Sequence, residues 1–285
     1  MPVIWRKAVW MRFVLGSIGL ITSSLAILGI VRGVITAWWL RRYSVVMEPH
    51  RRGDYESALQ ACEGLEVRGK VTRPYCFFRG TNLSHLGRLE EAEVWLRRNI
   101  AMHQKDWYKR DLAIGFTALG EAMLQAGRYD DAQQSFEASL THFPQRGSDY
   151  RCMAELCLLR RDNPVEPLRL AKLAIEHDQV DLSLSLEGRR TIVGEAQATL
   201  AWATATGTHN PSEVARLVAE AVDSVGERYV PATALVRYQS GRAYAELGDF
   251  QASTQHYEEA ARLDPQGNWG RAARAALTSS RGDGQ

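Results

Sequence analysis

Residues 116–144 read FTALGEAMLQAGRYDDAQQSFEASLTHFP, and this stretch indicates the fold class. Phe116, Leu119 and Met123 recur at steps of three and four residues, which places their side chains on one face of a helix. After a break at Gly127, the same spacing returns in Tyr129, Ala132 and Phe136. The stretch therefore predicts a hairpin of two helices closed by a glycine turn.

The same register recurs in other parts of the chain. Residues 238–265 read YQSGRAYAELGDFQASTQHYEEAARLDP and repeat the spacing, and an earlier copy starts at Tyr75. Small residues at a helix crossing let two backbones approach, while large ones fill the gaps beside it. The repeat-defining positions are Gly80, Ala92, Phe116, Gly120, Ala132, Phe136, Pro144, Gly241, Tyr257 and Pro265. Because one hairpin leaves an apolar face uncovered, the copies are expected to stack.

These residues resemble the tetratricopeptide repeat, whose pattern is W-x2-L-G-x2-Y, then A-x3-F and a closing proline. Phe116 stands for the tryptophan and Met123 for the tyrosine, while the remaining positions match the pattern. The resemblance implies an all-α fold, a right-handed superhelix of stacked helical hairpins that forms an α-solenoid. It also implies recognition of a protein or a peptide in the concave groove, which the first helices of the hairpins line.

The pattern divides the chain into five segments. A basic tail (1–12) precedes a transmembrane anchor (13–35), and a linker or an extension of the anchor helix (36–52) leads to the repeats. The solenoid (53–279) is expected to hold about six units, the first a half repeat, and to end in a capping helix. Residues 280–285 are expected to be disordered.

The anchor is predicted from the apolar run FVLGSIGLITSSLAILGIV at 13–31. Its 19 uncharged residues make about 28 Å of helix, close to the roughly 30 Å hydrocarbon thickness of a bilayer. The alternatives are a cleaved signal peptide, whose apolar core is usually shorter, and a buried helix. Trp38 and Trp39 resemble an interfacial belt and favour a single-pass membrane anchor.

Basic residues flank this span on both sides, with more of them after it than before it. That asymmetry favours repeats on the cytoplasmic side, whereas retention of the short basic tail inside would place them on the extracytoplasmic side. Gly29 and Gly33 form a G-x-x-x-G pair, which predicts a homo-oligomer contact through the transmembrane helix. The alternative is a pair of small residues at a membrane boundary.

The composition excludes some classes of function. With 24% charged and 45% hydrophobic residues the chain is not of a disordered type, and a net charge of +2 argues against nucleic-acid binding driven by bulk charge. The seven histidines are scattered singly, and no phosphate-binding loop or G-x-S-x-G is present. We therefore expect no enzyme activity, no cofactor and no metal. Cys62 and Cys76 fall on successive predicted helices, either as buried thiols or as a disulfide in an oxidising compartment.

The groove of the predicted solenoid is the candidate binding site. Positions just beyond the large-residue slots of the first helices, and one turn further on, are expected to face a partner: Phe77, Thr81, Thr117, Glu121, Tyr238 and Arg242. Related proteins hold acidic chain ends with a lysine and asparagine clamp, which this sequence lacks. We expect a membrane-anchored scaffold or adaptor that supports assembly of a membrane or envelope complex. The alternative is a regulatory subunit that senses a peptide or ligand and controls a membrane enzyme.

Overall fold

The computed structural model describes residues 43–65, 71–102, 109–161, 163–181, 184–226 and 228–282. These residues are helical apart from turns and short connections, with no strand among them. Internal contacts separate a unit of residues 1–45 from a larger unit of residues 46–285. The fold below is that of the larger unit.

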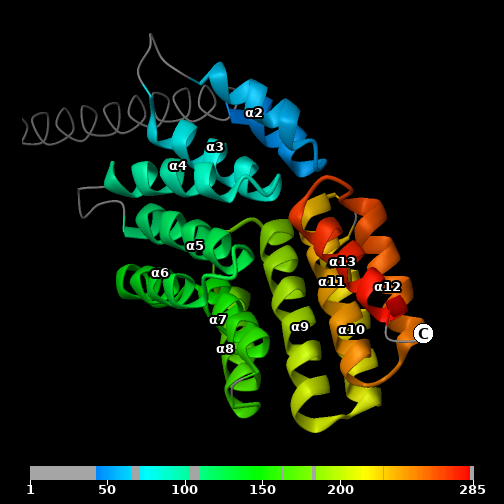
Figure 1. Ribbon diagram of the computed structural model, residues 1–285. Helices are drawn as coiled ribbons and strands as arrows, with labels where there is room; N and C mark the ends of the chain where they lie inside the picture. The colour runs from blue at the N-terminus through cyan, green and yellow to red at the C-terminus, as the bar shows by residue number, and fades with distance from the viewer. Residues whose placement is uncertain are drawn as a thin grey trace, which may run out of the picture. The chain divides into compact units, whose positions relative to one another are not determined.

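Helical hairpins follow one another along the described chain, as the sequence predicts for the fold class (Figure 1). The helices are α2 (Tyr55–Glu63), α3 (Arg73–His85), α4 (Leu89–Ala101), α5 (Lys109–Gln125), α6 (Tyr129–His142), α7 (Gly147–Arg160), α8 (Val165–Val180), α9 (Leu186–Thr208), α10 (Pro211–Val225), α11 (Val230–Glu246), α12 (Phe250–Leu263) and α13 (Asn268–Gly282). Each odd-numbered helix from α3 to α11 also contacts the next odd-numbered helix. The first helices of successive hairpins therefore form one continuous inner layer.

The first hairpin is more complete than the sequence suggests. Residues 43–51 are helical and lead into the turn at Gly53, so α2 has a first helix before it instead of standing as a half repeat. Val46 and His50 on this helix are buried. Pro49 obscured the helix in the sequence, because proline in a helix interior normally interrupts it.

Glycine turns join the two helices of four hairpins. Gly53, Gly87, Gly127 and Gly248 have φ between +70° and +77°, a left-handed conformation that costs glycine nothing. Where aspartate follows, as at Asp54 and Asp249, its carboxylate accepts a hydrogen bond from a backbone N–H and caps the next helix. Where arginine follows, the guanidinium pairs with an acid three residues on, as in Arg88 with Glu91 and Arg128 with Asp131.

The hairpin crossings bring a glycine against a large side chain. A Cβ placed on Gly80 would lie 2.6 Å from Leu96 Cγ, and one on Gly241 would lie 2.6 Å from Tyr257 Cδ1. At Gly120 the added atom would overlap the ring of Phe136. Ala92 and Ala132 are fully buried on the second helices of their hairpins. The absence of side chains at these glycines is what lets the paired helices approach.

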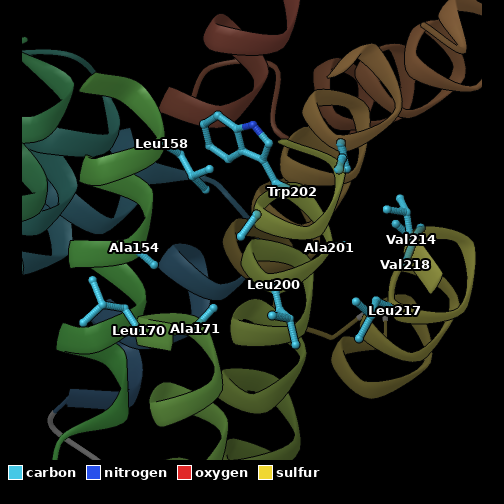
Figure 2. Packing of buried hydrophobic residues seen from close by; sticks show 13 residues of the cluster. Ala154, Leu158, Leu170, Ala171, Leu200, Ala201, Trp202, Val214, Leu217 and Val218 are labelled. Carbon is cyan, nitrogen blue, oxygen red and sulfur yellow. The ribbon is translucent and has the colours of Figure 1, made fainter. Parts of the chain in front are cut away.

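The largest described side chain with almost no exposure is Trp202, on α9. It belongs to an apolar cluster to which α7, α8, α9 and α10 contribute aliphatic residues, among them Leu158, Leu170, Leu200 and Leu217 (Figure 2). Alanines on α9 let the neighbouring helices pack closely around this long helix. The cluster holds the middle hairpins together.

The predicted anchor, residues 13–35, lies outside the described residues, as do the basic tail 1–12 and the first part of the linker. Of the helices that the structure describes, none has the length and apolarity needed to span a bilayer. At the other end, α13 provides the capping helix and continues to Gly282.

Candidate functional site

A cavity of about 690 Å³ lies on the inner layer of helices. Its walls come from residues 47–51, from α3, α5 and α7, from the first turns of α9, and from Tyr229 just before α11. Four acidic and four basic side chains line it together with aromatic ones: Glu48, Glu121, Glu187, Glu195, Arg51, Arg146, Arg151, Arg228, Phe77, Phe78 and Tyr229. The site is thus polar, with both signs of charge close together.

Four of the six predicted groove residues lie on this cavity, namely Phe77, Thr81, Thr117 and Glu121. Thr81 also turns its hydroxyl back to the carbonyl of Phe77, 2.9 Å away. Thr117 is only 3% exposed, and its hydroxyl is engaged in hydrogen bonds to α5 and α7. A partner would therefore touch Phe77, Thr81 and Glu121 more readily than Thr117.

The other two predicted groove residues do not line the cavity. Tyr238 is buried against Tyr257 and Trp269, because α13 packs across the inner side of α11. The guanidinium of Arg242 lies 4.6 Å from the ring centre of Trp202, where the two form a cation–π contact. Residues at equivalent repeat positions thus face the cavity on α3 and α5, whereas on α11 other side chains cover them.

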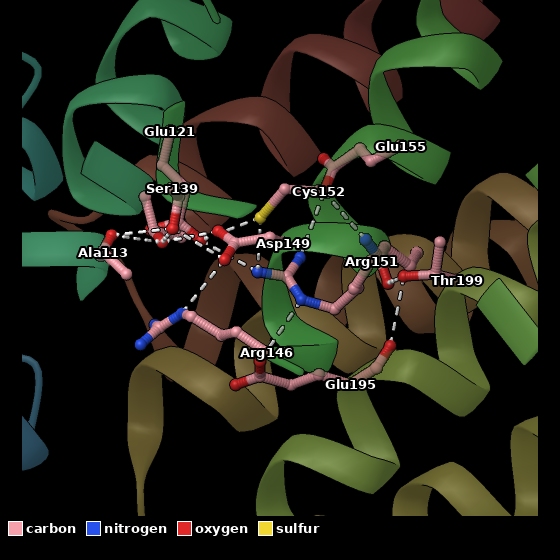
Figure 3. A network of polar contacts seen from close by, with 12 residues as sticks. Ala113, Glu121, Ser139, Arg146, Asp149, Arg151, Cys152, Glu155, Glu195 and Thr199 are labelled. Carbon is pink, nitrogen blue, oxygen red and sulfur yellow. Dashed lines mark hydrogen bonds and ion pairs between the residues drawn. The ribbon is translucent and has the colours of Figure 1, made fainter. Parts of the chain in front are cut away.

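The floor of the cavity is an ionic network centred on Arg151 of α7 (Figure 3). Its guanidinium lies 2.8 Å from Glu121 of α5, 3.3 Å from Glu155 of α7 and 3.5 Å from Glu195 of α9. Glu155 also accepts a hydrogen bond from Gln239 of α11, at 3.1 Å. One buried cation thus serves three carboxylates from three helices, which leaves an excess of acid beneath the cavity.

Burial raises the pKa of both Glu155 and Glu195 to about 7, although Arg151 acts in the opposite direction. Asp178 of α8 behaves in the same way, with burial raising its pKa to about 7 despite the charges of Arg151 and Arg146. These carboxyl groups exchange protons close to neutral pH. The charge beneath the cavity therefore varies with pH in the physiological range.

A second polar group adjoins the first at Asp149 of α7. Its carboxylate accepts hydrogen bonds from Thr117 at 2.5 Å and from Ser139 at 2.7 Å, and lies 3.5 Å from Arg146. The side chain is fully buried, and burial raises its pKa. This cluster fixes α7 against the α5/α6 hairpin at the edge of the cavity.

Sequence reasoning missed Arg151, Glu195, His50, His85 and Tyr229. One local signal was available, because Arg151 and Glu155 stand four residues apart among the apolar residues of α7 and so share the buried face. The two histidines gave no such signal. They lie on the first helices of successive hairpins, yet their ring centres lie 5.2 Å apart.

The cysteines Cys62 and Cys76 are buried free thiols, and no disulfide links them. Burial raises the pKa of Cys62 to about 12, so this thiol stays protonated. Across the described residues, no group of three or more His, Cys, Asp or Glu is placed to hold a metal ion.

The sequence of one hairpin matches a known family. Residues 234–266, which include most of α11 and all of α12, match the model of the tetratricopeptide repeat family. No curated protein sequence matches the chain. The repeat inferred at 238–265 from its spacing is therefore confirmed at the level of the family, for this hairpin.

Several solved structures of tetratricopeptide proteins are similar to the chain. YrrB, described as having an unusual peptide-binding site, is 16% identical with a TM-score of 0.37, over 73% of this chain and 92% of its own. A tetratricopeptide protein from Parabacteroides merdae is 11% identical with a TM-score of 0.39, over 82% and 98%. The TPR2AB domain of yeast Sti1, in a complex with pHSP90, is 12% identical with a TM-score of 0.33, over 82% and 94%.

Proposed function

We propose that the protein is a membrane-anchored scaffold of the tetratricopeptide type, which holds a protein or peptide partner in its cavity close to a bilayer. In that position it supports assembly of a membrane or envelope complex. The observation that carries the proposal is the cavity of about 690 Å³ on the inner layer of first helices. Its size falls within the range of roughly 300–1,000 Å³ typical of ligand sites.

The chemistry of the walls favours a polar peptide over an apolar small molecule. Glu121 and Arg51 offer charges of opposite sign, while Phe77 and Phe78 offer aromatic surface. A peptide carries backbone donors and acceptors, charged side chains and apolar groups, so it matches a wall of this mixed kind. The apolar run at 13–31 would keep the bound partner near the membrane, on the cytoplasmic side by the count of flanking charges.

Photo-crosslinking in native membranes tests partner binding. A benzoylphenylalanine placed at Phe77 should give a discrete adduct, identified by mass spectrometry, because this residue lines the cavity. The matched control replaces Phe250, which is 68% exposed on α12 and lies outside the cavity lining. The same adducts from both positions, or none from Phe77, would contradict the proposal.

A pair of threonine variants then tests whether the cavity is the binding site. Thr81→Trp should abolish the adduct, since an indole fills part of the cavity. Thr141→Trp serves as control, because Thr141 makes the same hydroxyl-to-carbonyl hydrogen bond, at 2.9 Å, on the exposed side of α6. An adduct that survives in Thr81→Trp would place the partner elsewhere.

Deleting residues 1–42 tests the anchor. The remaining chain should leave the membrane fraction and stay helical in circular dichroism. Retention in the membrane fraction would refute the anchor without bearing on the cavity. Crosslinking of the full chain to itself, lost on changing Gly29 and Gly33 to leucine, would support a homo-oligomer through this helix.

A further inference from the structure

Segments from the two ends of the larger unit contact each other. Tyr55 of α2 donates a hydrogen bond to Asp264 at 3.0 Å, and His85 of α3 lies 2.9 Å from the side-chain oxygen of Asn268. Further contacts join His50 to Tyr229, at 3.1 Å, and Arg271 to the backbone carbonyl of His85, at 2.9 Å. We call this set the closure seam: His50, Tyr55 and His85 on one side, and Tyr229, Asp264, Asn268 and Arg271 on the other.

The closure seam lies between segments that are far apart in the chain. In Figure 1 the N-terminal end of α2 approaches the loop before α13, and its C-terminal end lies further from that loop. Tyr55 is the first residue of α2. The partners are separated by 179 residues for His50 and Tyr229 and by 209 residues for Tyr55 and Asp264. A row of stacked hairpins ordinarily has two free ends, but here the ends meet.

The closure seam differs in chemistry from the joints between neighbouring hairpins. Those joints contain apolar clusters, and each of the clusters found among the described residues lies on one side of the seam. The seam contacts, in contrast, are mainly hydrogen bonds that water can replace once the two sides separate, beside one tilted ring pair, His50 with Tyr229 at 6.0 Å, and Val230 against Gly53. An exchanged hydrogen bond changes the free energy little, whereas separating an apolar joint exposes surface to water. Because no apolar cluster crosses it, we expect the seam to be the joint that opens at least cost, although Tyr55 and Asp264 are fully buried there.

The closure seam also forms part of the binding site. His50, His85 and Tyr229 line the cavity of about 690 Å³, and a smaller cavity of about 100 Å³ is lined by His85, Tyr229, Asn268 and Trp269. A ligand in the larger cavity would thus touch residues from both sides of the seam. Such contacts exist only while the seam is closed, so a ligand that makes them stabilises the closed state.

We propose that the closure seam is a gate to the cavity, which opens as a unit while the apolar joints stay intact and closes again around a bound chain. The gate restricts entry by size. A small molecule reaches the cavity in the closed state, whereas a bulky polypeptide enters only when the first hairpin separates from α13. This device goes beyond partner binding itself, and it is measured without a partner.

Hydrogen exchange on the full chain, purified in detergent, tests the opening. Tyr55→Phe removes the hydrogen bond to Asp264 and keeps the ring that stacks on His85 at 4.6 Å. Amides of α2 and α13 should then exchange about 5-fold faster, the factor for one net hydrogen bond, while α9 and α10 keep their rates. Tyr150→Phe is the matched control, because its hydroxyl donates to the carbonyl of Pro144 outside the seam.

A uniform rise in exchange over all helices would overturn the proposal, as would unchanged exchange in α2 and α13. If Tyr55→Phe fails to fold, Asn268→Ala provides the same test, since it removes the side-chain partner of His85. In that variant too, faster exchange must be confined to the two sides of the closure seam.

Thiol labelling tests the entry by size. Thr81 lines both cavities, so a cysteine is placed there. Its reaction is followed by mass spectrometry with two reagents, N-ethylmaleimide and a maleimide that carries a polyethylene glycol of about 5 kDa. The second reagent is far larger than a ligand that fits such a cavity. Adding Tyr55→Phe should accelerate the bulky reagent about 5-fold and leave the small one unchanged. Equal acceleration of both reagents, or of neither, would show that entry does not pass through the closure seam. Neither result would depend on the identity of the partner.

Discussion

Helix α7 takes part in two regions that are stabilised in opposite ways. Ala154 and Leu158 join the apolar cluster around Trp202. Arg151 and Glu155, on the same buried face of the helix, form the ionic floor of the cavity. Apolar burial there is favourable whatever the exact partner, whereas the buried charges are stable only when every member of the network is present. The apolar contacts of α7 should therefore tolerate substitution by other apolar residues, whereas its ionic contacts require the complete network.

The first test of this comparison is the loss of Trp202. Trp202→Ala should lower the free energy of unfolding by about 3–5 kcal/mol, since it leaves a cavity at the junction of four helices. Denaturant unfolding followed by circular dichroism measures the change. Trp95→Ala is the control, because Trp95 is only partly buried. An equal loss in both variants would show that the joint around Trp202 is no more important than the periphery.

The ionic floor should respond in a way that depends on pH. Arg151→Leu should cost roughly 3 kcal/mol at pH 8, because without the guanidinium the buried Glu155 and Glu195 must either stay charged or take up protons. At pH 5.5 these groups carry protons, given a pKa of about 7, and the cost should shrink. Arg97→Leu removes an exposed arginine and should cost little at either pH. A loss independent of pH would contradict the ionic account.

The hairpin crossing offers a test on a smaller scale. Gly120→Ala should cost about 1–3 kcal/mol, because its methyl group overlaps the ring of Phe136. The control is Gly188→Ala in the first turn of α9, where the nearest atom, Ser185 Oγ, lies 3.2 Å from the added Cβ. That change should be neutral or slightly stabilising, since alanine favours helix over glycine. Thermal melting compares the two, and equal effects would argue against the close crossing.

The smallest expected effect is the pH dependence of the unmodified chain near neutrality. The folded-state pKa of Glu155 and Glu195 is raised to about 7, against about 4.3 in the unfolded chain. The stability that these two groups add to the folded state is complete below about pH 4.3, and it is lost as the pH rises through about 7. Four charged groups face Glu195 from the helices around it: Arg151, Glu155, Glu121 and Asp178.

The histidines of the closure seam act with the opposite sign. Burial lowers the pKa of His85 to about 3, so its contribution is present above pH 6.5 and is lost as pH falls towards 3. His50, Arg271, Asp264 and Tyr55 are the titratable groups nearby. Between about pH 6.5 and 7.5 the loss from Glu155, Glu195 and Asp178 exceeds the remaining gain from the histidines, so stability should decline over this range. Glu195→Gln should flatten this decline, and an unchanged slope would contradict it.

The sequence predicted the hairpins well because their signals are local. The glycine turns and the small-to-large crossings depend on residues within about one repeat of each other, and helical periodicity reports such relations directly. Gly120 and Phe136 lie sixteen positions apart in the numbering, and they meet in the structure. A local signal also marks the start of α10, where the side chain of Asn210 accepts a hydrogen bond from the N–H of Glu213 and caps the helix.

The candidate site was only partly predictable. The positions that face inwards on α3 and α5 followed from the repeat register, and Phe77 and Glu121 lie on the cavity as that register implies. The same register predicted an exposed Tyr238, and this prediction was wrong because Trp269 of α13 packs against it. The spacing of residues within α11 does not indicate that another helix covers this face. Of the ionic floor, only the pair Arg151 and Glu155 left a local signal, because the other two carboxylates come from α5 and α9.

By itself, the sequence determined the all-helical hairpins, their glycine turns and the family of the repeat at 234–266. Only the tertiary structure decided that Arg151 gathers three carboxylates and that Tyr55 reaches Asp264. The physical reason is that each hairpin rotates slightly against the previous one, and the sum of these rotations places the last hairpin. Local periodicity carries no record of that sum, so contacts across many repeats emerge only when all of them are stacked.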